Sequence, residues 1–392
     1  MEVSRLRALT DRPGVAALLG ALGPGQARLV GGAVRDGLLD RPVTDLDLAT
    51  ALSPYEVMRR CGAAGIKTIP TGIAHGTVTA VSRGETVEIT TLRADLATDG
   101  RHATVAFTDD WREDAARRDF TVNALYFDPA TGELSDWFGG LDDLAAGRVR
   151  FIGEPLQRIA EDHLRILRFF RFTARFAAVV DEQGLAACAE RANDLMALSR
   201  ERIADEWLKL LALPDPVPTV RLMLERAILS PVLPEVDGEA LPQLSALIAA
   251  EAEADLAPDP LRRFSALLPA DPLLAEKVAA RLKLSNRARK RLASAALRDL
   301  GHMPQALAYA IGVEQAQDRL LLAGKVEEAR GLTGWDVPRL PIAGGALIAR
   351  GLKPGPIVAR TLKAIEAGWV AEGFPGPERL EQLIADALSK AA

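Results

Sequence analysis

Segments with strand character are confined to the first third of this 392-residue chain, and this restriction most limits what the chain can fold into. Short runs rich in β-branched residues and bounded by Gly, Pro or Asp are typical of strands. They occupy residues 28–30, 45–48, 77–81, 86–91 and 120–126. After about residue 140, helical patterns take over, with proline-rich breaks at 214–218, 231–234, 258–260 and 269–272. The sequence therefore predicts an α+β fold, in which a small head with a β-sheet and helices precedes an all-helical remainder.

The same patterns divide the chain into four predicted domains. We expect the head at 1–138, a helical neck at 139–200, a helical body at 201–275 and a helical tail at 276–392. A chain of this length normally builds two or more domains, each with its own core.

The composition excludes several classes of site. Cys61 and Cys188 are the only cysteines and lie far apart in the sequence, so neither a disulfide framework nor a cysteine zinc site is expected. The four histidines are also isolated, so any metal must be held by carboxylates. No apolar run is long enough to span a bilayer, and residues 1–20 lack the apolar core of a secretory signal. We expect a cytoplasmic protein that does not contact a membrane.

A glycine pair and two aspartates form the densest motif. Gly31 and Gly32 end a predicted strand and begin a predicted helix, an arrangement that lets the backbone approach a phosphate, although a Gly-Gly pair alone also fits a plain turn. Asp45 and Asp47 are separated by one residue of a strand, so their carboxylates point the same way, about 7 Å apart. Two like charges held together need a cation, and oxygen ligands select Mg²⁺ rather than zinc.

Glu88 supplies a third carboxylate, from a later predicted strand. Together with Asp45 and Asp47 it could hold two metal ions, one to lower the pKa of an attacking hydroxyl and one to brace the phosphates of a leaving group. With Arg35 nearby to bind phosphate, this set indicates phosphoryl or nucleotidyl transfer.

Several motifs in a fixed order make the chain resemble the class II tRNA nucleotidyltransferases and bacterial poly(A) polymerases of the polymerase-beta superfamily. They are Gly31-Gly-Ala-Val-Arg-Asp36, Asp45-Leu-Asp47, Arg117-Arg-Asp-Phe-Thr-Val-Asn-Ala124, Glu161-Asp-His-Leu-Arg165 and Arg202-Ile-Ala-Asp-Glu-Trp-Leu-Lys-Leu-Leu211. The likeness covers roughly the first 55% of the chain, and an ordered set is far more specific than one motif. It implies a polymerase-beta-type head with catalytic residues Asp45, Asp47 and Glu88, of which Asp45 and Asp47 hold Mg²⁺.

The resemblance also implies nucleotide-binding residues. Gly31, Gly32 and Arg35 would hold the triphosphate, and the segment 117–124 would contact sugar and triphosphate through Arg118, Asp119 and Asn123. For Asp119 and Asn123, a buried polar pair kept for packing alone is the alternative. Arg168 and Arg171 are assigned to nucleotide or phosphate binding on the resemblance alone.

In the family, residues at the positions of Asp162 and Arg165 read the incoming base. We predict one helix over 161–175, in which this pair shares a face; an ordinary ion pair is the alternative. An Asp that accepts from an exocyclic amino group and an Arg that donates to a ring nitrogen fit cytosine and adenine, and reject uracil and guanine. Arg168 and Arg171 continue at three-residue steps, and each step turns the side chain about 60° further around the helix axis. We therefore do not expect these two arginines to share one helical face with Asp162 and Arg165.

Two other segments follow from the same resemblance. Residues 93–104 are polar and contain glycine, which indicates a mobile loop; in the family a loop here helps the site change from C to A. Arg202 and Glu206 lie at i and i+4 in a helical stripe, which the family uses to brace the base-reading helix.

The predicted function is addition of C, C and A from CTP and ATP to the 3′ end of tRNA, with no protein partner implied. A poly(A) polymerase of the same fold, an inactive RNA-binding protein and a nucleotidyltransferase acting on a protein or antibiotic are the alternatives. Net charge is −5, yet residues 277–298 carry only basic charges. We predict that this stretch binds RNA backbone through Lys277, Arg281, Lys283, Arg287, Arg289, Lys290 and Arg291, although a solvated basic helix is equally consistent with it.

Overall fold

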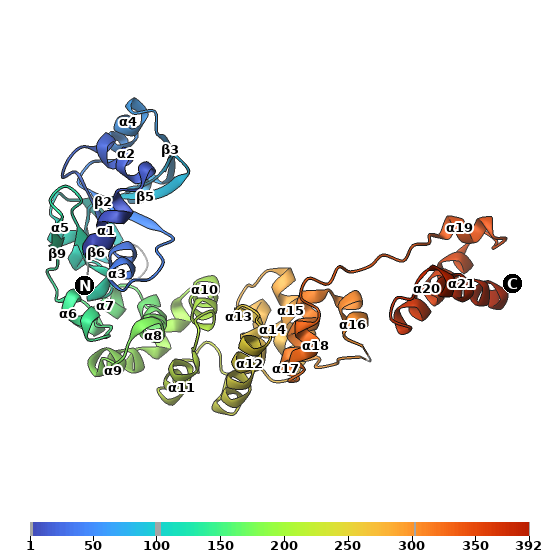
Figure 1. Ribbon diagram of the computed structural model, residues 1–392. Coiled ribbons are helices and arrows are strands. Elements are labelled where there is room, and N and C mark those ends of the chain that lie inside the picture. The colour runs from blue at the N-terminus through green and yellow to red at the C-terminus, as the bar shows by residue number, and fades with distance from the viewer. Residues whose placement is uncertain (1–2, 99–102, 302, 392) are drawn as a thin grey trace. The chain divides into compact units, whose positions relative to one another are not determined.

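The computed structural model describes residues 3–98, 103–301 and 303–391. They form two compact units: unit 1 consists of Met1–Glu206 with Glu225–Val232, and unit 2 of Trp207–Leu224 with Leu233–Ala392. All the strands lie in unit 1, and unit 2 is helical throughout its described residues (Figure 1). The predicted α+β fold, with a helical remainder after the head, is therefore confirmed. The four predicted domain ranges stay a prediction, which the two units do not test.

The main sheet of unit 1 has seven strands in the order β3-β4-β5-β2-β1-β8-β9. Their bounds are β1 Ala27–Val30, β2 Leu46–Thr50, β3 Lys67–Gly72, β4 Thr77–Ser82, β5 Glu85–Thr91, β8 Tyr126–Phe127 and β9 Leu134–Ser135. Neighbouring strands are antiparallel except β2 and β5, which are parallel and pair Asp47 with Glu88. This pairing places two of the predicted catalytic carboxylates side by side.

A two-residue turn fixes the pairing of β4 with β5. Ser82 pairs with Glu85, and between them Arg83 and Gly84 both have positive φ, 48° and 85°. Two successive residues with φ above zero are typical of the tight hairpin turns that match strand twist. The register of β5 against β4 is therefore set at this turn.

The sequence located four of the strands and was wrong about a fifth. Residues 120–126 were predicted as a strand, but only Tyr126 and Phe127 pair in the sheet, and Thr121–Asn123 forms a 3₁₀ turn, η2. The Asp119 carboxylate accepts from the Phe120 N–H at 2.9 Å. Such side-chain bonds compete with a strand ladder for the backbone donors. Strand β3 was missed because it is a largely exposed edge strand that contains Pro70.

The predicted loop over 93–104 is also wrong for most of its length. Strands β6, Arg93–Thr98, and β7, Ala103–Phe107, pair antiparallel as a separate two-stranded sheet, with Arg93 opposite Phe107. The remaining residues of that prediction, 99–102, lie outside the described residues.

Helices pack closely against the main sheet. The first four are α1 Val3–Thr10, α2 Pro13–Leu22, α3 Gly32–Leu38 and α4 Pro54–Ala63. Helix α2 buries Val15, Leu18 and Leu22, and a Cβ on its Gly14 would lie 2.3 Å from the Ser82 carbonyl oxygen. Only glycine allows the helix to approach the sheet this closely.

The rest of unit 1 is mainly helical and includes α5 Trp111–Ala116, α6 Gly140–Ala145, α7 Pro155–Glu161, α8 Leu164–Phe176 and α9 Glu182–Glu190. The single helix predicted over 161–175 is therefore two helices. The break falls at Asp162, whose backbone is extended (φ −153°, ψ 105°) and whose carboxylate accepts from the Leu164 N–H at 3.1 Å. Such a bond from an Asp side chain to the backbone two residues later competes with helical hydrogen bonding, so the chain leaves the helix at Asp162 and α8 begins at Leu164.

Both cysteines lie in unit 1 and are buried as free thiols. Burial raises the pKa of the Cys61 and Cys188 thiols. Cys61 and Cys188 therefore pack as small apolar side chains, and neither forms a disulfide.

Unit 2 is built of helices whose starts explain the proline-rich breaks. It contains the end of α10 Arg200–Leu211 and most of α11 Val217–Glu225, followed by α12 Leu241–Glu253, α13 Pro260–Leu267, α14 Pro272–Arg281, α15 Asn286–Ala296, α16 Pro304–Ile311, α17 Val313–Leu322, α18 Val326–Arg330, α19 Gly344–Ala349, α20 Pro356–Ala371 and α21 Pro377–Ala391. Pro260 and Pro272 stand at the first position of a helix, each after an Asp cap. Proline favours that position because its missing N–H would be unpaired there anyway. Among the described residues, no helix is long and apolar enough to cross a membrane.

A buried network of charges holds α12, α13 and α17 together. Glu251 on α12 accepts from Arg262 at 2.9 Å and from Arg263 at 2.8 Å, while Asp318 on α17 accepts from Arg262 at 2.9 Å. All four side chains are almost fully buried. Each guanidinium thus depends on its carboxylate, because a buried charge without a partner is strongly destabilising.

We predict that Glu251→Ala lowers the free energy of unfolding of unit 2 by about 3–5 kcal/mol, since it leaves Arg263 buried without a carboxylate and Arg262 with Asp318 alone. The control is Glu381→Ala, which breaks the exposed pair with Arg350 and should leave stability almost unchanged. Urea unfolding of both variants measures the difference. Equal losses in the two variants would contradict the assignment of the network as a stability determinant.

Candidate active site

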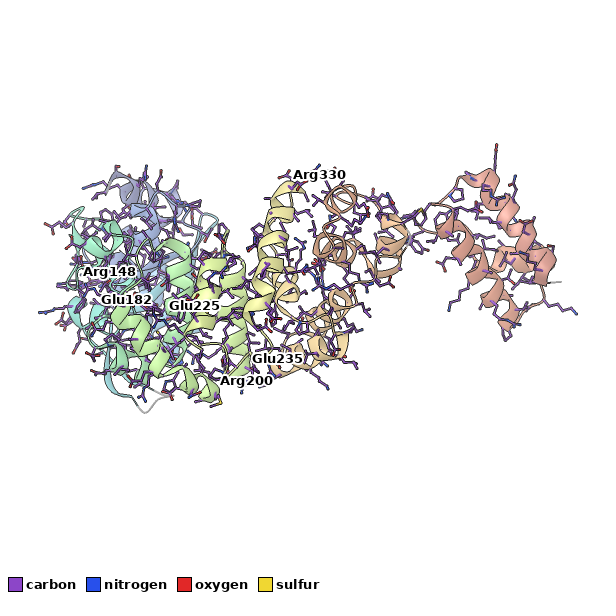
Figure 2. The ribbon with its side chains drawn as sticks, turned by 90° about the horizontal axis from the view of Figure 1, so that it is seen from below. Arg148, Glu182, Arg200, Glu225, Glu235 and Arg330 are labelled. Atoms are coloured by element: carbon purple, nitrogen blue, oxygen red, sulfur yellow. The ribbon has the colours of Figure 1, made fainter. Side chains whose placement is uncertain are left out.

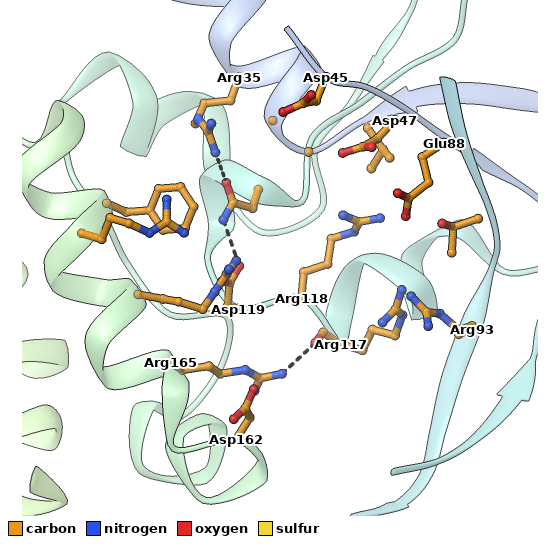
Figure 3. A pocket seen from close by; sticks show the side chains of 18 of the residues that line it. Arg35, Asp45, Asp47, Glu88, Arg93, Arg117, Arg118, Asp119, Asp162 and Arg165 are labelled. Carbon is orange, nitrogen blue, oxygen red and sulfur yellow. Dashed lines mark hydrogen bonds and ion pairs between the residues drawn. The ribbon is translucent and has the colours of Figure 1, made fainter. Parts of the chain in front are cut away.

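A pocket of about 620 Å³ in unit 1 brings together every residue predicted to act in catalysis or nucleotide binding (Figure 3). Its lining includes Gly31, Gly32, Arg35, Asp45, Asp47, Glu88, Arg118, Asp119, Asn123, Asp162, Arg165, Arg168 and Arg171. They come from the sheet, from the segment after α5 and from the start and middle of α8. The pocket is therefore the candidate active site.

The three predicted catalytic carboxylates lie on neighbouring strands. Asp47 on β2 is the register partner of Glu88 on β5, and Asp45 directly precedes β2. Figure 3 shows them together on one side of the pocket. Burial, helped by the charges of Glu88 and Asp45, raises the pKa of Asp47 to about 6, although Arg118 opposes the shift. The charge of an ionised Asp47 is therefore poorly stabilised in the folded protein, because of burial first and of the neighbouring carboxylates second.

These carboxylates fit a hard divalent cation. Among the described residues, no three His, Cys, Asp or Glu side chains are grouped closely enough to form a complete protein-only metal site. Asp45 and Asp47 offer carboxylate oxygens from two positions, and the raised pKa of Asp47 shows that a positive charge would be stabilised beside it. Mg²⁺ characteristically takes one or two carboxylates and completes its shell with water and substrate phosphates.

Gly31 creates the turn between β1 and α3. Its φ is +64°, and a Cβ there would lie 3.3 Å from Arg118 Nη1 and 3.5 Å from the Asn123 carbonyl oxygen. A side chain would be strained in this conformation and crowded by the guanidinium. The glycine therefore keeps the backbone beside Arg118 open to the pocket.

Asp114 anchors the arginines of the 117–118 pair and was missed by sequence reasoning. Its carboxylate accepts from Arg117 Nε at 2.8 Å, from Arg118 Nη2 at 3.2 Å and from the Tyr126 hydroxyl at 2.6 Å. Burial alone would raise the pKa of Asp114, but Arg118 and Arg117 outweigh it and lower the pKa to about 2. The spacing of three and four residues from Asp114 to the two arginines was the signal that could have found it, had a helix been predicted there.

A chain of hydrogen bonds joins α3 to α8 through Asp119. Arg35 Nη1 donates to Asn123 Oδ1, the Asn123 amide donates to Asp119 Oδ1 at 2.9 Å, and Arg168 Nε donates to Asp119 Oδ2 at 2.7 Å. Burial alone would raise the pKa of Asp119, but Arg168 and Asn123 lower it. These bonds support the packing alternative for Asp119 and Asn123, and their direct contact with a nucleotide stays a prediction.

Asp162 and Arg165 line the pocket but do not form the ion pair considered from the sequence. Arg165 donates to Glu161 Oε2, to the Arg158 carbonyl at 2.9 Å and to the Arg117 carbonyl at 3.1 Å. Arg202 donates to Asp162 at 2.7 Å. The expected shared helical face is wrong, because Asp162 lies in the break between α7 and α8. Each side chain is instead held by its own partner.

The predicted bracing role of α10 is confirmed by these contacts. Arg202 holds Asp162, and Glu206, one turn later, accepts from Arg171 Nε at 2.6 Å. Asp162, Arg165, Arg168 and Arg171 all line the pocket, although three-residue steps turn the three arginines to different faces of the helix. Long arginine side chains span the rotation between successive steps.

Phe172 is a further residue that the sequence did not single out. Its ring lies beneath three guanidiniums, those of Arg35, Arg168 and Arg171, with carbon-to-centroid distances of 5.1, 5.3 and 4.3 Å. Such cation–π contacts favour a fixed arrangement of the cations. The pocket is also lined by Thr90, Arg93, Arg117 and Arg175, which the predictions did not include.

The predicted RNA-binding stretch is only partly available for RNA. Arg291 is buried, with 7% of its side chain exposed, and pairs with Asp259, Glu314 and Asp318, so its assignment to RNA is corrected to a structural role. The acidic partners come from distant segments, which inspection of the run itself could not reveal.

The other arginines of the stretch also have acidic neighbours. Arg281 pairs with Glu235 (labelled in Figure 2), Arg287 with Glu314 and Arg289 with Glu276. Lys277, Lys283 and Lys290 are exposed. The lysines, together with Arg287, whose side chain is 83% exposed, therefore form an accessible part of this surface.

Comparison with known proteins gives the same result as the motifs. Residues 27–150 match the family described as the poly A polymerase head domain, and residues 179–239 match the family described as the probable RNA- and SrmB-binding site of polymerase A. The human protein named CCA tRNA nucleotidyltransferase 1, mitochondrial, is 47% identical over 195 residues. The head region of the chain therefore matches this family model, and the chain is similar to the class II tRNA nucleotidyltransferases and bacterial poly(A) polymerases.

Other proteins resemble the chain over different lengths. The CCA-adding enzyme of Enterococcus faecalis is 39% identical over 188 residues, which is 47% of this chain and 45% of that protein. The human alignment likewise covers 47% of this chain and 44% of its relative, so the chain matches less than half the length of these two proteins. The crystal structure of the Bacillus stearothermophilus CCA-adding enzyme in complex with CTP aligns with a TM-score of 0.75 and 27% identity, covering 100% of this chain and 99% of the other. The alignment with the fold of that enzyme thus covers the whole of this chain.

We predict that Asp47→Asn stabilises the metal-free protein at pH 7.5 by roughly 1–2 kcal/mol, because the folded state holds an ionised Asp47 whose pKa is raised to about 6. A raised carboxyl pKa makes the folded wild type lose stability as the pH rises from about 4 to about 6. The advantage of the variant should therefore vanish near pH 4. Denaturant unfolding at pH 7.5 and near pH 4 measures the difference in stability between the variant and wild type. A variant that is less stable than wild type at pH 7.5 would contradict a destabilising charge on Asp47.

Proposed function

We propose that this protein is a template-independent CCA tRNA nucleotidyltransferase, which adds C, C and A from CTP and ATP to the tRNA 3′ end with release of pyrophosphate. One observation carries the proposal: a pocket that holds Asp45, Asp47 and Glu88 also holds Asp162 and Arg165, each fixed by its own partner. The names of its human and Enterococcus relatives support CCA addition over other reactions of the family.

The carboxylates would carry out the transfer step. Glu88 would accept the proton of the tRNA 3′ hydroxyl, whose oxygen attacks the α-phosphorus of the nucleotide while the bond to pyrophosphate breaks. Asp45 and Asp47 would hold a divalent cation, for which we propose Mg²⁺; when bound, it supplies Lewis-acid stabilisation of the phosphate charges. Gly31, Gly32, Arg35 and Arg118 would orient the triphosphate, so most of the catalysis comes from positioning and electrostatics.

Asp162 and Arg165 would select the base. Asp162 accepts from Arg202 through Oδ2 and from the Leu164 N–H through Oδ1, and each oxygen keeps a further lone pair for an exocyclic amino group. Arg165 is held by backbone carbonyls in a fixed direction. Cytosine and adenine both present an amino group beside a ring nitrogen acceptor, whereas uracil and guanine do not. Protein side chains would then do the work of a nucleic-acid template.

Two other activities use the same fold. A poly(A) polymerase would need the same carboxylates, and an inactive RNA-binding protein would need neither them nor the base-selecting pair. The intact carboxylate set, with the raised pKa of Asp47, favours an enzyme. We also propose that the enzyme works in the cytoplasm, in keeping with its free cysteines.

The direct test is incorporation of each labelled nucleotide, with Mg²⁺, into tRNA that ends at its discriminator base and into an unrelated RNA. We predict two C and one A on tRNA alone, and a loss of at least 100-fold for Asp45→Ala, because a metal-holding carboxylate is removed. Long A tails on both RNAs would instead identify a poly(A) polymerase. Tight RNA binding without incorporation would favour the inactive alternative.

We further propose that the exposed lysines of 277–290 bind the tRNA backbone. Lys290→Ala should weaken tRNA binding at low salt without changing stability, and should lower the salt dependence of binding by about one phosphate contact. Its neighbour Arg291 is the matched control: Arg291→Met should reduce stability, because Asp318 is left buried without this partner. Filter binding across a salt series and thermal unfolding separate the two effects. Unchanged binding by Lys290→Ala would remove this surface from the RNA site.

A further inference from the structure

We propose that Phe107 and Arg93 form a platform for the 3′ end of the RNA substrate, on which the Phe107 ring stacks against the terminal base. This inference rests on the proposed function, because it places the second substrate of that reaction. It concerns the side of the pocket that the predicted nucleotide-binding residues leave unassigned.

Two substrates must meet at the carboxylates. The nucleotide is assigned to Gly31 and Arg118 for its phosphates and to Asp162 and Arg165 for its base. The remaining polar lining next to Glu88 consists of Thr90, Arg93 and Arg117. Figure 3 shows Arg93 and Arg117 on the side of the pocket away from Arg35. A hydroxyl that reaches Glu88 can approach over this side without crossing the assigned nucleotide.

The chemistry of this side suits an RNA backbone. Arg93 and Arg117 bring two guanidiniums to one part of the pocket lining, and guanidiniums favour phosphate oxygens. Both residues are held by the buried carboxylate of Asp114, which accepts from the Arg93 backbone N–H at 3.0 Å and from Arg117 Nε at 2.8 Å. Their positions relative to each other are therefore fixed before RNA binds.

Phe107 lies beside this cationic edge. It is the register partner of Arg93 in the β6–β7 hairpin, and cross-strand partners project from the same face. Its ring is 52% exposed. A Cβ on Gly76 would lie 2.8 Å from ring atom Cε1, so the ring is seated on a bare glycine backbone. One part of the ring is thus supported, and the rest is open to a ligand.

A supported, half-exposed ring next to guanidiniums is the combination that binds single-stranded nucleic acid. Bases stack on such rings regardless of sequence, while arginines hold the backbone. The proposed reaction requires this tolerance, because the terminal base is the discriminator base before the first addition and C before the second and third. An isolated exposed ring is too small a patch for a protein interface. RNA is therefore the occupant that fits both the ring and the charges.

The test uses tRNA that carries 2-aminopurine as its terminal base and a 3′-deoxy end, so that stacking is read from fluorescence without reaction. Wild type should quench the probe. Phe107→Ala should abolish the quenching and raise the KM for natural tRNA at least about five-fold, while the KM for CTP stays unchanged. Phe107→Trp should restore both values. Arg93→Gln should lower the salt dependence of tRNA binding by about one contact.

Tyr55→Ala is the matched control, because Tyr55 is a more exposed aromatic residue, 72%, of the same unit. It should change neither the quenching nor any KM. Normal quenching and KM in Phe107→Ala, or a rise in the KM for CTP in place of that for tRNA, would overturn the platform. A wild type that quenches the probe but incorporates no nucleotide would support the platform and refute the proposed function.

Discussion

The carboxylate of Asp119 is the interaction on which the rest of the site depends. It is buried at the end of the segment that follows α5, and it joins Asn123 and Arg35 on one side to Arg168 of α8 on the other. The glycine turn before α3 and the helix that begins after Asp162 are therefore fixed against each other through one side chain. The cost of burying that charge is offset because each of its oxygens receives a donor.

The two kinds of charge in the pocket are treated differently by the fold. Its arginines have carboxylates behind them: Asp114 for Arg117 and Arg118, and Glu206 for Arg171. Asp47 has no comparable partner. Burial and the neighbouring carboxylates raise its pKa more than the charge of Arg118 lowers it. The pocket is thus prepared for two ligands at once, a polyanion that meets ordered guanidiniums and a cation that meets under-compensated carboxylates.

The sequence predicted the site more completely than the elements that build it. Spacing identified Asp45, Asp47 and Glu88, because alternation along a strand places side chains without any knowledge of their neighbours. It failed where a polar side chain redirected the backbone, as at Asp162, which lies between two helices and accepts from the Leu164 N–H. It also failed where a partner lies far away in the chain. Arg291 was predicted as an RNA contact because Asp318 could not be associated with it from local sequence.

The tight turn at Arg83 and Gly84 has a consequence beyond joining two strands. Side chains alternate along a strand, so a slip of one residue between β4 and β5 would move Glu88 to the opposite face of the sheet while leaving the ladder intact. The activity of the site is thus decided partly at a solvent-facing loop that touches no substrate. A substitution in this turn that shifts the register would give a protein that still folds and binds its ligands but lacks the proposed catalytic activity. Inspection of the pocket residues alone would not reveal such a defect.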